Sequence, residues 1–102
     1  MQEDLLRVLG IMGPYSNYEV FSGTAADAES GYYDLPDGIK RLDIIVVGNP
    51  LKVRLVMPGK GASKQIAIPA DTIFTVFISP DRFTVQNYTA GSNAIYSIVA
   101  WM

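Results

Sequence analysis

Apolar and β-branched residues recur in short runs along this chain, and each run ends at residues that favour turns. In the C-terminal third, from Gln65 to Met102, the runs QIAIP, TIFTVFI, FTVQNY and NAIYSIVAWM follow one another. Each gap between them contains Gly, Pro, Asn, Asp or Ser. Short β-branched and aromatic runs that are separated by turn residues are typical of strands joined by tight turns. The pattern therefore predicts an antiparallel sheet in this third of the chain.

The preceding residues continue the same pattern. YEVFSG at 18–23, YYDL at 32–35 and LKVRLVM at 51–57 are short and partly alternating, whereas the run 39–47 closes with the four apolar residues from Ile44 to Val47. Alternation is expected where one face of a strand meets water, and a continuous apolar run where both faces are covered. Ile44 to Val47 therefore predicts a central strand that is covered on both faces.

Together the runs predict an all-β fold. About seven or eight short antiparallel strands, without a helix of convincing length, favour a β-sandwich or a jelly-roll-like domain. We expect this to be a single domain over residues 18–102, because 102 residues without a linker are a common length for one domain. A small open barrel is the alternative.

Residues 1–17 do not follow the strand pattern. Gly10, Gly13 and Pro14 interrupt a helix after barely two turns, so we expect an N-terminal arm that is extended or has one short helical turn. Its apolar side chains are too many to leave in water: Leu5, Leu6, Val8, Leu9, Ile11 and Met12. The arm is expected to pack either on the core of its own domain or on another chain.

The last run, Ala94 to Met102, is apolar on both sides of the predicted strand. The alternation places Ile95, Val99 and Trp101 on one face and Tyr96, Ile98 and Met102 on the other. Two apolar faces need two partners. One partner is the opposing sheet, and the other is the N-terminal arm or a neighbouring subunit.

Composition restricts the chemistry that is available. Hydrophobic residues make up 49% of the chain and charged residues 18%, a balance that is typical of a folded domain with a core. Cysteine is absent, so there is neither a disulfide nor a thiolate metal site. Histidine is also absent, which removes the usual general base near neutral pH and the commonest transition-metal ligand. We therefore expect no enzyme, no cofactor and no metal site, although carboxylate or lysine chemistry remains open.

Charge and hydropathy argue against two classes of partner. The net charge is −2, and the eight lysines and arginines are scattered rather than arranged in a basic stripe, so nucleic acid is not an expected partner. The apolar run from Leu5 to Met12 is broken by Arg7 and Gly10 and follows an acidic start. Such a segment is neither a signal peptide nor a membrane span, so we expect synthesis in the cytosol and no membrane partner.

Two loops contain residue types that bind ions. The acidic loop with Asp27, Glu29, Asp34 and Asp37 offers carboxylates for Ca²⁺, but Gly38 stands where an EF-hand loop needs an acidic residue. A solvated loop is the favoured interpretation. The segment PGKGASK at 58–64 has the glycines and lysines of a phosphate-binding loop, but a predicted strand follows it instead of a helix. An exposed hairpin loop is expected there.

Two further groups suggest carbohydrate chemistry. Tyr32, Tyr33 and Trp101 could stack against sugars, although tyrosines in β-sandwiches more often lie half-buried between strands and loops. Asp43 and Glu19 could form an acid/base pair, but glycoside hydrolysis needs a groove and a raised pKa on one carboxyl group. The sequence indicates neither of these, so no catalytic residue is assigned.

The order of these motifs resembles a known group of proteins. The run GYYDLPDGIKRLDIIVVGNPLKVRLVMPG is followed by IAIPADTIFTVFISPDRFTVQNYTAGSNAIYSIVAWM. This part, from Gly31 to Met102, resembles the small all-β structural proteins of tailed-bacteriophage virions. Many of these end in a strand-turn-strand of the form FTVxNxTAGS, followed by alternating apolar residues and an aromatic residue. The resemblance implies assembly into a capsid or a tail.

From the resemblance and the apolar pattern we expect a virion structural protein. The leading hypothesis is a capsid decoration or cement protein that is made in the host cytoplasm, forms a homo-oligomer, with a trimer favoured, and binds the major capsid protein on the capsid surface. Obligate interfaces bury apolar residues, and the expected interface residues are Leu5, Leu9, Ile11, Met12, Tyr96 and Ile98. The alternatives are a tail or baseplate adaptor and a carbohydrate-binding host-adhesion domain that uses Tyr32 and Tyr33.

Overall fold

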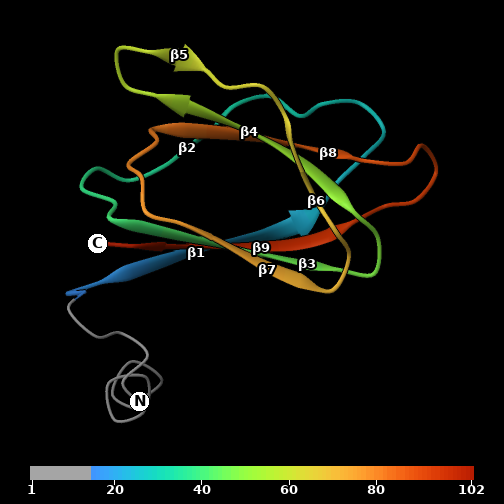
Figure 1. Ribbon diagram of the computed structural model, residues 1–102, viewed down its shortest axis with the longest axis horizontal. Helices are drawn as coiled ribbons and strands as arrows, with labels where there is room; N and C mark the ends of the chain where they lie inside the picture. Colours follow the sequence, from blue (N-terminus) through green and yellow to red (C-terminus); the bar gives the residue numbers. More distant parts are fainter. Residues whose placement is uncertain (1–14) are drawn as a thin grey trace, which may run out of the picture.

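The chain folds into two antiparallel sheets that lie one on the other (Figure 1). The computed structural model describes residues 15–102. Its strands are β1 (Tyr18–Thr24), β2 (Tyr33–Asp34), β3 (Arg41–Val47), β4 (Leu51–Met57), β5 (Gly61–Ala62), β6 (Ile66–Ile68), β7 (Thr72–Val76), β8 (Arg82–Asn87) and β9 (Ile95–Trp101). The predicted all-β sandwich is confirmed. Residues 15–102 contain nine strands where seven or eight were expected, because the two-residue strand β5 forms inside the segment 58–64 that was predicted to be a hairpin loop.

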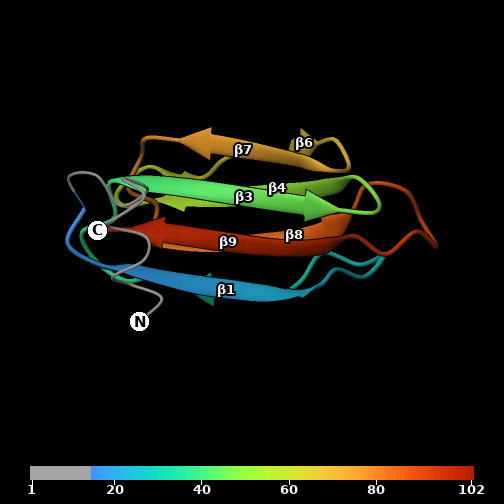
Figure 2. The ribbon, with the colours of Figure 1, turned by 90° about the horizontal axis from the view of Figure 1, so that it is seen from below.

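The first sheet has the strand order β1-β9-β3-β7, which Figure 2 shows face on. The second sheet has the order β2-β8-β4-β5, and β6 also pairs with β4. β3 lies between β9 and β7, so the prediction that Ile44 to Val47 forms part of a central strand is confirmed. The prediction that both faces are covered there is only half right, because the side chain of Val47 is 46% exposed on the outer side.

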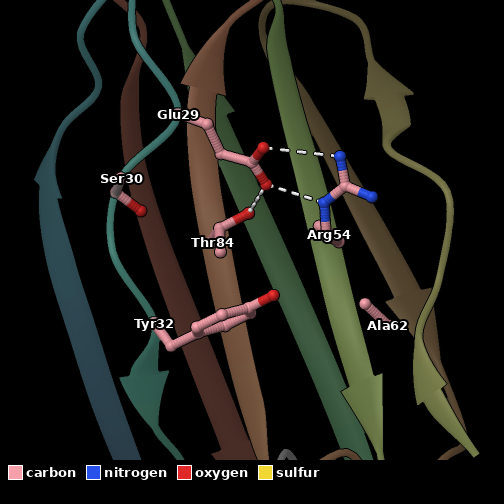
Figure 3. Close-up of a pocket in the computed structure, with 6 residues that line it drawn as sticks. All are labelled: Glu29, Ser30, Tyr32, Arg54, Ala62 and Thr84. Atoms are coloured by element: carbon pink, nitrogen blue, oxygen red, sulfur yellow. Dashed lines mark hydrogen bonds and ion pairs between the residues drawn. The ribbon is translucent and has the colours of Figure 1, made fainter.

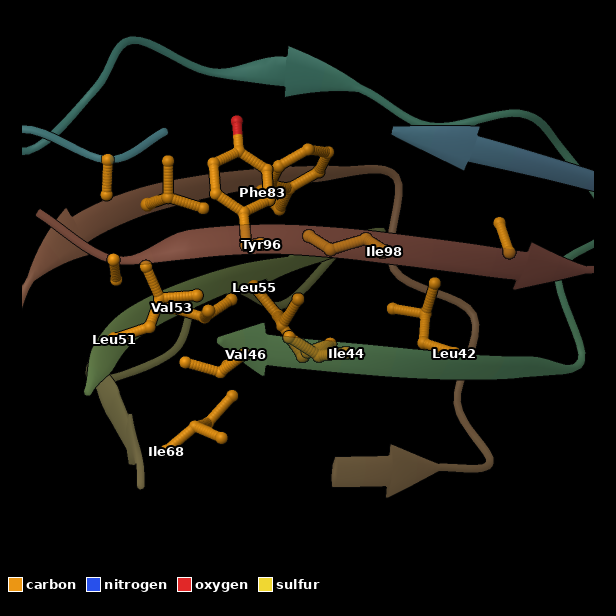
Figure 4. Close-up of a cluster of buried hydrophobic side chains, with 14 of the residues drawn as sticks. Leu42, Ile44, Val46, Leu51, Val53, Leu55, Ile68, Phe83, Tyr96 and Ile98 are labelled. Carbon is orange, nitrogen blue, oxygen red and sulfur yellow. The ribbon is translucent and has the colours of Figure 1, made fainter. Parts of the chain in front are cut away.

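The core lies between the two sheets (Figure 4). Alternate residues of β3 and β9 point inward and meet alternate residues of β4 and β8. The contributors with the largest buried side chains are Ile39, Leu42, Ile44, Val46, Leu51, Val53, Ile68, Phe83 and Ile98. Burial of each such side chain contributes about 1.5–3 kcal/mol, so the strand period alone places most of the stabilising surface in one layer.

Two of the expected interface residues belong to this core. Tyr96 is 6% exposed and Ile98 is fully buried, and both point at the second sheet. Their assignment to an interface with another chain was wrong. Strand β9 is apolar on both sides, and its sequence does not reveal which side meets the second sheet. The other expected interface residues, Leu5, Leu9, Ile11 and Met12, lie outside the described residues.

A close contact joins the ends of the described chain. The backbone N–H groups of Ser16 and Asn17 donate to the carbonyl oxygen of Met102 at 2.8 and 3.3 Å, and the N–H of Met102 donates to Asn17 at 2.9 Å. These bonds extend the β1–β9 pairing at the end that carries Trp101. The residues that enter β1 are therefore fixed beside the last strand. Over residues 15–102, no helix is long and apolar enough to cross a membrane.

Candidate functional site

The outer side of the first sheet exposes a group of apolar side chains. Val20, Val47, Ile73, Phe77 and Ile95 are between 46% and 71% exposed, and together we call them the apolar face. The strand register places four of them on one side of the sheet, because Ile95 pairs with Val47, Ile73 pairs with Ile45 two residues away, and Val20 pairs with Val99 on the same side of β9. Phe77 follows β7 and lies on the same side, with its ring centroid 5.8 Å from the guanidinium carbon of the outward-pointing Arg41. The second sheet lies on the opposite side. These side chains consequently play no part in the core.

At one end of the apolar face an aromatic cluster covers the sheet. The ring of Trp101 lies 5.7 Å from that of Tyr15 and 5.4 Å from that of Tyr18. Trp101 is only 5% exposed although it points away from the second sheet. The two tyrosines therefore provide the partner for the outer side of β9 at this end.

Asp43 is a buried carboxylate under this cluster. It accepts hydrogen bonds from Trp101 Nε1 at 2.8 Å, Thr75 Oγ1 at 2.5 Å and Arg41 Nε at 3.0 Å. A buried charge is tolerated only when it is paired and hydrogen-bonded, and these three donors satisfy that condition. Asp43 therefore joins three neighbouring strands of the sheet.

Asp43 and Glu19 do not form the acid/base pair that the sequence left open. Asp43 pairs in register with Val99, and Glu19 pairs with Ala100. Consecutive residues of a strand point to opposite faces, so the two carboxylates lie on opposite sides of the sheet. The pair is absent for this reason.

The second sheet carries a pocket on its outer side (Figure 3). Its volume is about 310 Å³, and it is lined by Glu29, Ser30, Tyr32, Arg54, Ala62 and Thr84. We call it the polar pocket. The loop between β1 and β2 supplies the first three residues, while β4, β5 and β8 supply the others. The N–H of Ser30 donates to Val85 and its hydroxyl accepts from Val85, so the loop is fastened to β8.

An ion pair forms one wall of the polar pocket. Arg54 donates from Nε to Glu29 Oε2 at 2.7 Å and from Nη2 to Oε1 at 3.4 Å, and Thr84 Oγ1 donates to Oε2 at 2.5 Å. The Arg54 hydrogen bonds, followed by that of Thr84, lower the pKa of the Glu29 carboxyl below its usual value. Arg54 Nη1 also donates to the carbonyl oxygen of Ser63 at 2.9 Å. Both side chains are therefore held in place and charged.

The two tyrosines proposed for sugar binding lie in different surroundings. Tyr32 is 54% exposed, lines the polar pocket and has the guanidinium of Arg82 4.9 Å from its ring centroid. Tyr33 lies instead with its ring 5.2 Å from the buried Phe83. The structure does not bring Tyr32 and Tyr33 together in one site.

The carboxylates of the acidic loop also bind separate partners rather than one ion. Asp27 accepts hydrogen bonds from the backbone N–H of Gly91 at 2.8 Å and from Asn87 Nδ2 at 2.9 Å, and these bonds lower its pKa. Glu29 is paired with Arg54. Among residues 15–102, no group of three or more Asp, Glu, His or Cys side chains is placed to hold a metal ion.

The segment 58–64 forms the turn between β4 and β5 and includes β5 itself. The predicted exposed hairpin is confirmed. Arg54, Thr84 and Glu29 were not recognised as a group from the sequence. The alternation of LKVRLVM does place Arg54 on the solvent side of its strand, but nothing local links it to a loop 25 residues earlier.

Comparison with known proteins identifies the fold class. No family model and no curated protein sequence matches this chain. Among solved structures, the chain is similar to the cupin domain of Drosophila melanogaster CENP-C, with a TM-score of 0.54 and 11% identity over 81% of this chain. It spans 57% of the length of that domain.

Other solved structures show the same likeness. A cupin-2 domain protein from Shewanella frigidimarina has a TM-score of 0.52 and 10% identity over 85% of this chain and 72% of its own. A subunit of Bacillus endospore appendages, described as disulfide-linked pili, has a TM-score of 0.51 and 16% identity over 83% of each chain. Identities this low establish the fold alone. The chain is a jelly-roll-like β-sandwich of the kind that cupins share.

Proposed function

We propose that this chain is a non-enzymatic structural protein of a bacteriophage virion, of the decoration or cement type, and that its apolar face contacts the protein shell. The observation that carries the proposal is the apolar face itself. Five large apolar side chains lie on one side of one sheet, with exposed fractions from 46% at Val47 to 71% at Phe77. Single exposed apolar residues are common, but a group on one face is typical of a contact surface.

The size of the face favours a repetitive partner. Three strands of seven residues and one of five, about 4.8 Å apart and with a rise of about 3.3 Å per residue, give a footprint of roughly 400 Å². A standard interface buries about 800 Å² per partner, so one such contact is weak by itself. Attachment to a lattice of identical shell subunits compensates, because linked copies bind with a raised effective concentration. A homotrimer would present three such faces to the major capsid protein.

The partners of the carboxylates support a structural role. Asp43 and Asp27 each bind donors from other strands or turns, and Glu29 binds Arg54 and Thr84. Each of these carboxylates joins segments that are far apart in the sequence. We infer that they stabilise a scaffold, which is made in the host cytoplasm and then joins the virion.

The proposal is tested with two matched double variants. Ile73→Ser with Phe77→Ser removes the two most exposed apolar residues, and Lys52→Ser with Gln86→Ser changes the outer side of the second sheet. Particles purified from a host lysate are probed for the chain with an antibody. We expect wild type and the Lys52/Gln86 variant in the particles, and a loss of at least about tenfold for the Ile73/Phe77 variant, equivalent to about 1.4 kcal/mol.

Three results would change the conclusion. Wild type that is absent from purified particles contradicts the virion role. An Ile73/Phe77 variant that is retained as well as wild type contradicts the role of the apolar face. Gold-labelled antibody that decorates the tail rather than the shell would replace the decoration role with that of a tail or baseplate adaptor.

A further inference from the structure

The polar pocket lies on the outer side of the second sheet and the apolar face on the outer side of the first, so both surfaces can be used at the same time. We propose that this pocket binds one uncharged sugar residue of a glycan, with Tyr32 as the aromatic contact and the Glu29–Arg54 pair as the group that recognises hydroxyls. The proposal goes beyond attachment to a particle and does not depend on it.

The ion pair provides donors and acceptors side by side. An arginine side chain has five N–H donors. Three N–H groups of Arg54 are used, for the two oxygens of Glu29 and the carbonyl oxygen of Ser63. Glu29 Oε1 accepts one of these bonds and can accept another. Two free N–H donors next to a carboxylate oxygen suit neighbouring hydroxyl groups, which both donate and accept.

The charges of the pocket favour an uncharged ligand. Glu29 and Arg54 are opposite charges whose side chains are 31% and 29% exposed, so neither is left unpaired in the wall of the pocket. A free phosphate or carboxylate would have to compete with Glu29 for Arg54. Hydroxyl groups can bond to both members while the pair stays intact.

Tyr32 supplies the apolar part of the site. Its side chain reaches from the loop across β8 toward β4, below the ion pair (Figure 3). The guanidinium of Arg82 stacks near the ring, which helps to hold its orientation. A tyrosine ring combines a flat apolar face with a polar tip, and the C–H face of a sugar ring fits such a surface. More than half of the Tyr32 side chain remains exposed for this contact.

The size and rigidity of the pocket set the scale of the ligand. Its volume of about 310 Å³ is at the low end of the range of about 300–1,000 Å³ for small-molecule sites. One sugar residue fits, and the rest of a glycan would extend into solvent. Glu29 and Arg54 are already held by Thr84 and Ser63, so ligand binding requires little further ordering.

The test is a titration of isotope-labelled full-length protein with glucose, galactose and N-acetylglucosamine, followed by NMR. We expect amide shifts that are confined to residues 29–32, Arg54, Ala62 and Thr84. Tyr32→Ala should weaken binding at least about tenfold, and Glu29→Gln should also weaken it because one of the two carboxylate acceptors is replaced by an amide donor. Tyr88→Ala is the matched control, since Tyr88 is 55% exposed but lies outside the pocket.

A glycan array complements the titration and separates polymer-bound from free sugars. Binding on the array that is lost in Tyr32→Ala supports a glycan ligand, and shifts at the pocket with free sugars alone support a small sugar. The proposal would be overturned if neither array binding nor NMR shifts were seen, or if only acidic sugars bound. It would also be overturned if Tyr88→Ala weakened binding as much as Tyr32→Ala. Tyr32→Ala should still enter particles, and the Ile73/Phe77 variant should still bind sugar, so each proposal can fail alone.

Discussion

The outer faces of the two sheets differ more than their inner faces do. Both inner faces are apolar and meet in one core. On the outside, the first sheet exposes Val47, Ile73 and Ile95, whereas the second sheet carries Lys52 and Arg54 among its outward positions. A sandwich needs only one apolar side on each sheet. The second apolar side of the first sheet is therefore not required by the fold, and the proposed contact with the shell rests on this excess.

The carboxylates at the two outer faces also differ in how deeply they are buried. The Asp43 side chain, on the first sheet, is 11% exposed and accepts hydrogen bonds from three donors beneath the aromatic cluster. The Glu29 side chain, in the loop that lies over the second sheet, is 31% exposed and borders an open pocket. A buried carboxylate that is fully paired specifies the packing around it, while a half-exposed one can still accept a ligand. This difference is consistent with the proposals of a fixed contact for the first sheet and reversible binding for the second.

The largest effect on stability is expected at Trp101, in the aromatic cluster at one end of the first sheet. Trp101→Ala removes a nearly buried ring and one donor to Asp43, so it should lower the free energy of unfolding by about 3–5 kcal/mol. Urea denaturation measures the change. Trp101→Phe keeps most of the packing and loses the donor, and it should cost about 1–3 kcal/mol. A loss under about 1 kcal/mol for Trp101→Ala would show that the cluster is not part of the stable fold.

A smaller effect is expected at the buried amide of the second sheet. Asn87 is 3% exposed, donates to Asp27 and Asn93, and accepts from the N–H of Ala94 at 3.0 Å. Asn87→Ala leaves these groups without their partner and should cost about 1–3 kcal/mol. The exposed Thr89→Ala nearby should change stability by less than about 0.5 kcal/mol. Equal midpoints for the two variants in urea would contradict the role of the network.

The sequence predicts the class of fold well because strand formation is local. Turn residues delimit the strands, and the run Ile44 to Val47 identifies the central strand β3. The side of β9 that meets the second sheet is a different matter. Both sides of that strand are apolar, so the choice of Tyr96 and Ile98 as interface residues failed when the sheet order placed them in the core.

The candidate site could be predicted only in part for the same kind of reason. Tyr32 is recognisable as an aromatic residue in a polar loop. Its neighbours Arg54 and Thr84 come from strands 22 and 52 residues further along, and their positions depend on how the loop lies over β8. Contacts between segments this far apart leave no local pattern in a single sequence. The exposure of Ile73 and Phe77 could not be predicted either, because a continuous apolar run such as TIFTVFI indicates a strand that is covered on both faces, whereas the outer side of this segment is exposed.

Acid should weaken the second sheet through Glu29. The pKa of Glu29 is lowered from its usual 4.5 by Arg54 and Thr84, so the folded state binds its proton less readily than the unfolded state. The resulting stability is complete above pH 4.5 and is lost as the pH falls below that value and through the folded-state pKa.

Thermal unfolding measured from neutral pH down to about pH 3 tests this link. Glu29→Gln should lose less stability over the acid range than wild type does, because it has no proton to take up. Ile73→Ser, on the apolar face, should keep the wild-type acid dependence. An acid profile that is unchanged in Glu29→Gln would show that the ion pair does not couple to folding.

The smallest effect on stability is expected at the apolar face itself, where the effect on association should be greatest. Ile73 and Phe77 are 63% and 71% exposed, so Ile73→Ser and Phe77→Ser should each change the free energy of unfolding by less than about 0.5 kcal/mol. By contrast, Leu55→Ala in the core should cost about 2–5 kcal/mol. Denaturation measures both, and light scattering should show less self-association in the serine variants. A loss above about 1.5 kcal/mol for Phe77→Ser would mean that another part of the same chain covers the apolar face. Packing of residues 1–17 on their own domain is one of the two possibilities that the sequence leaves open. The contact with the shell would then need another surface.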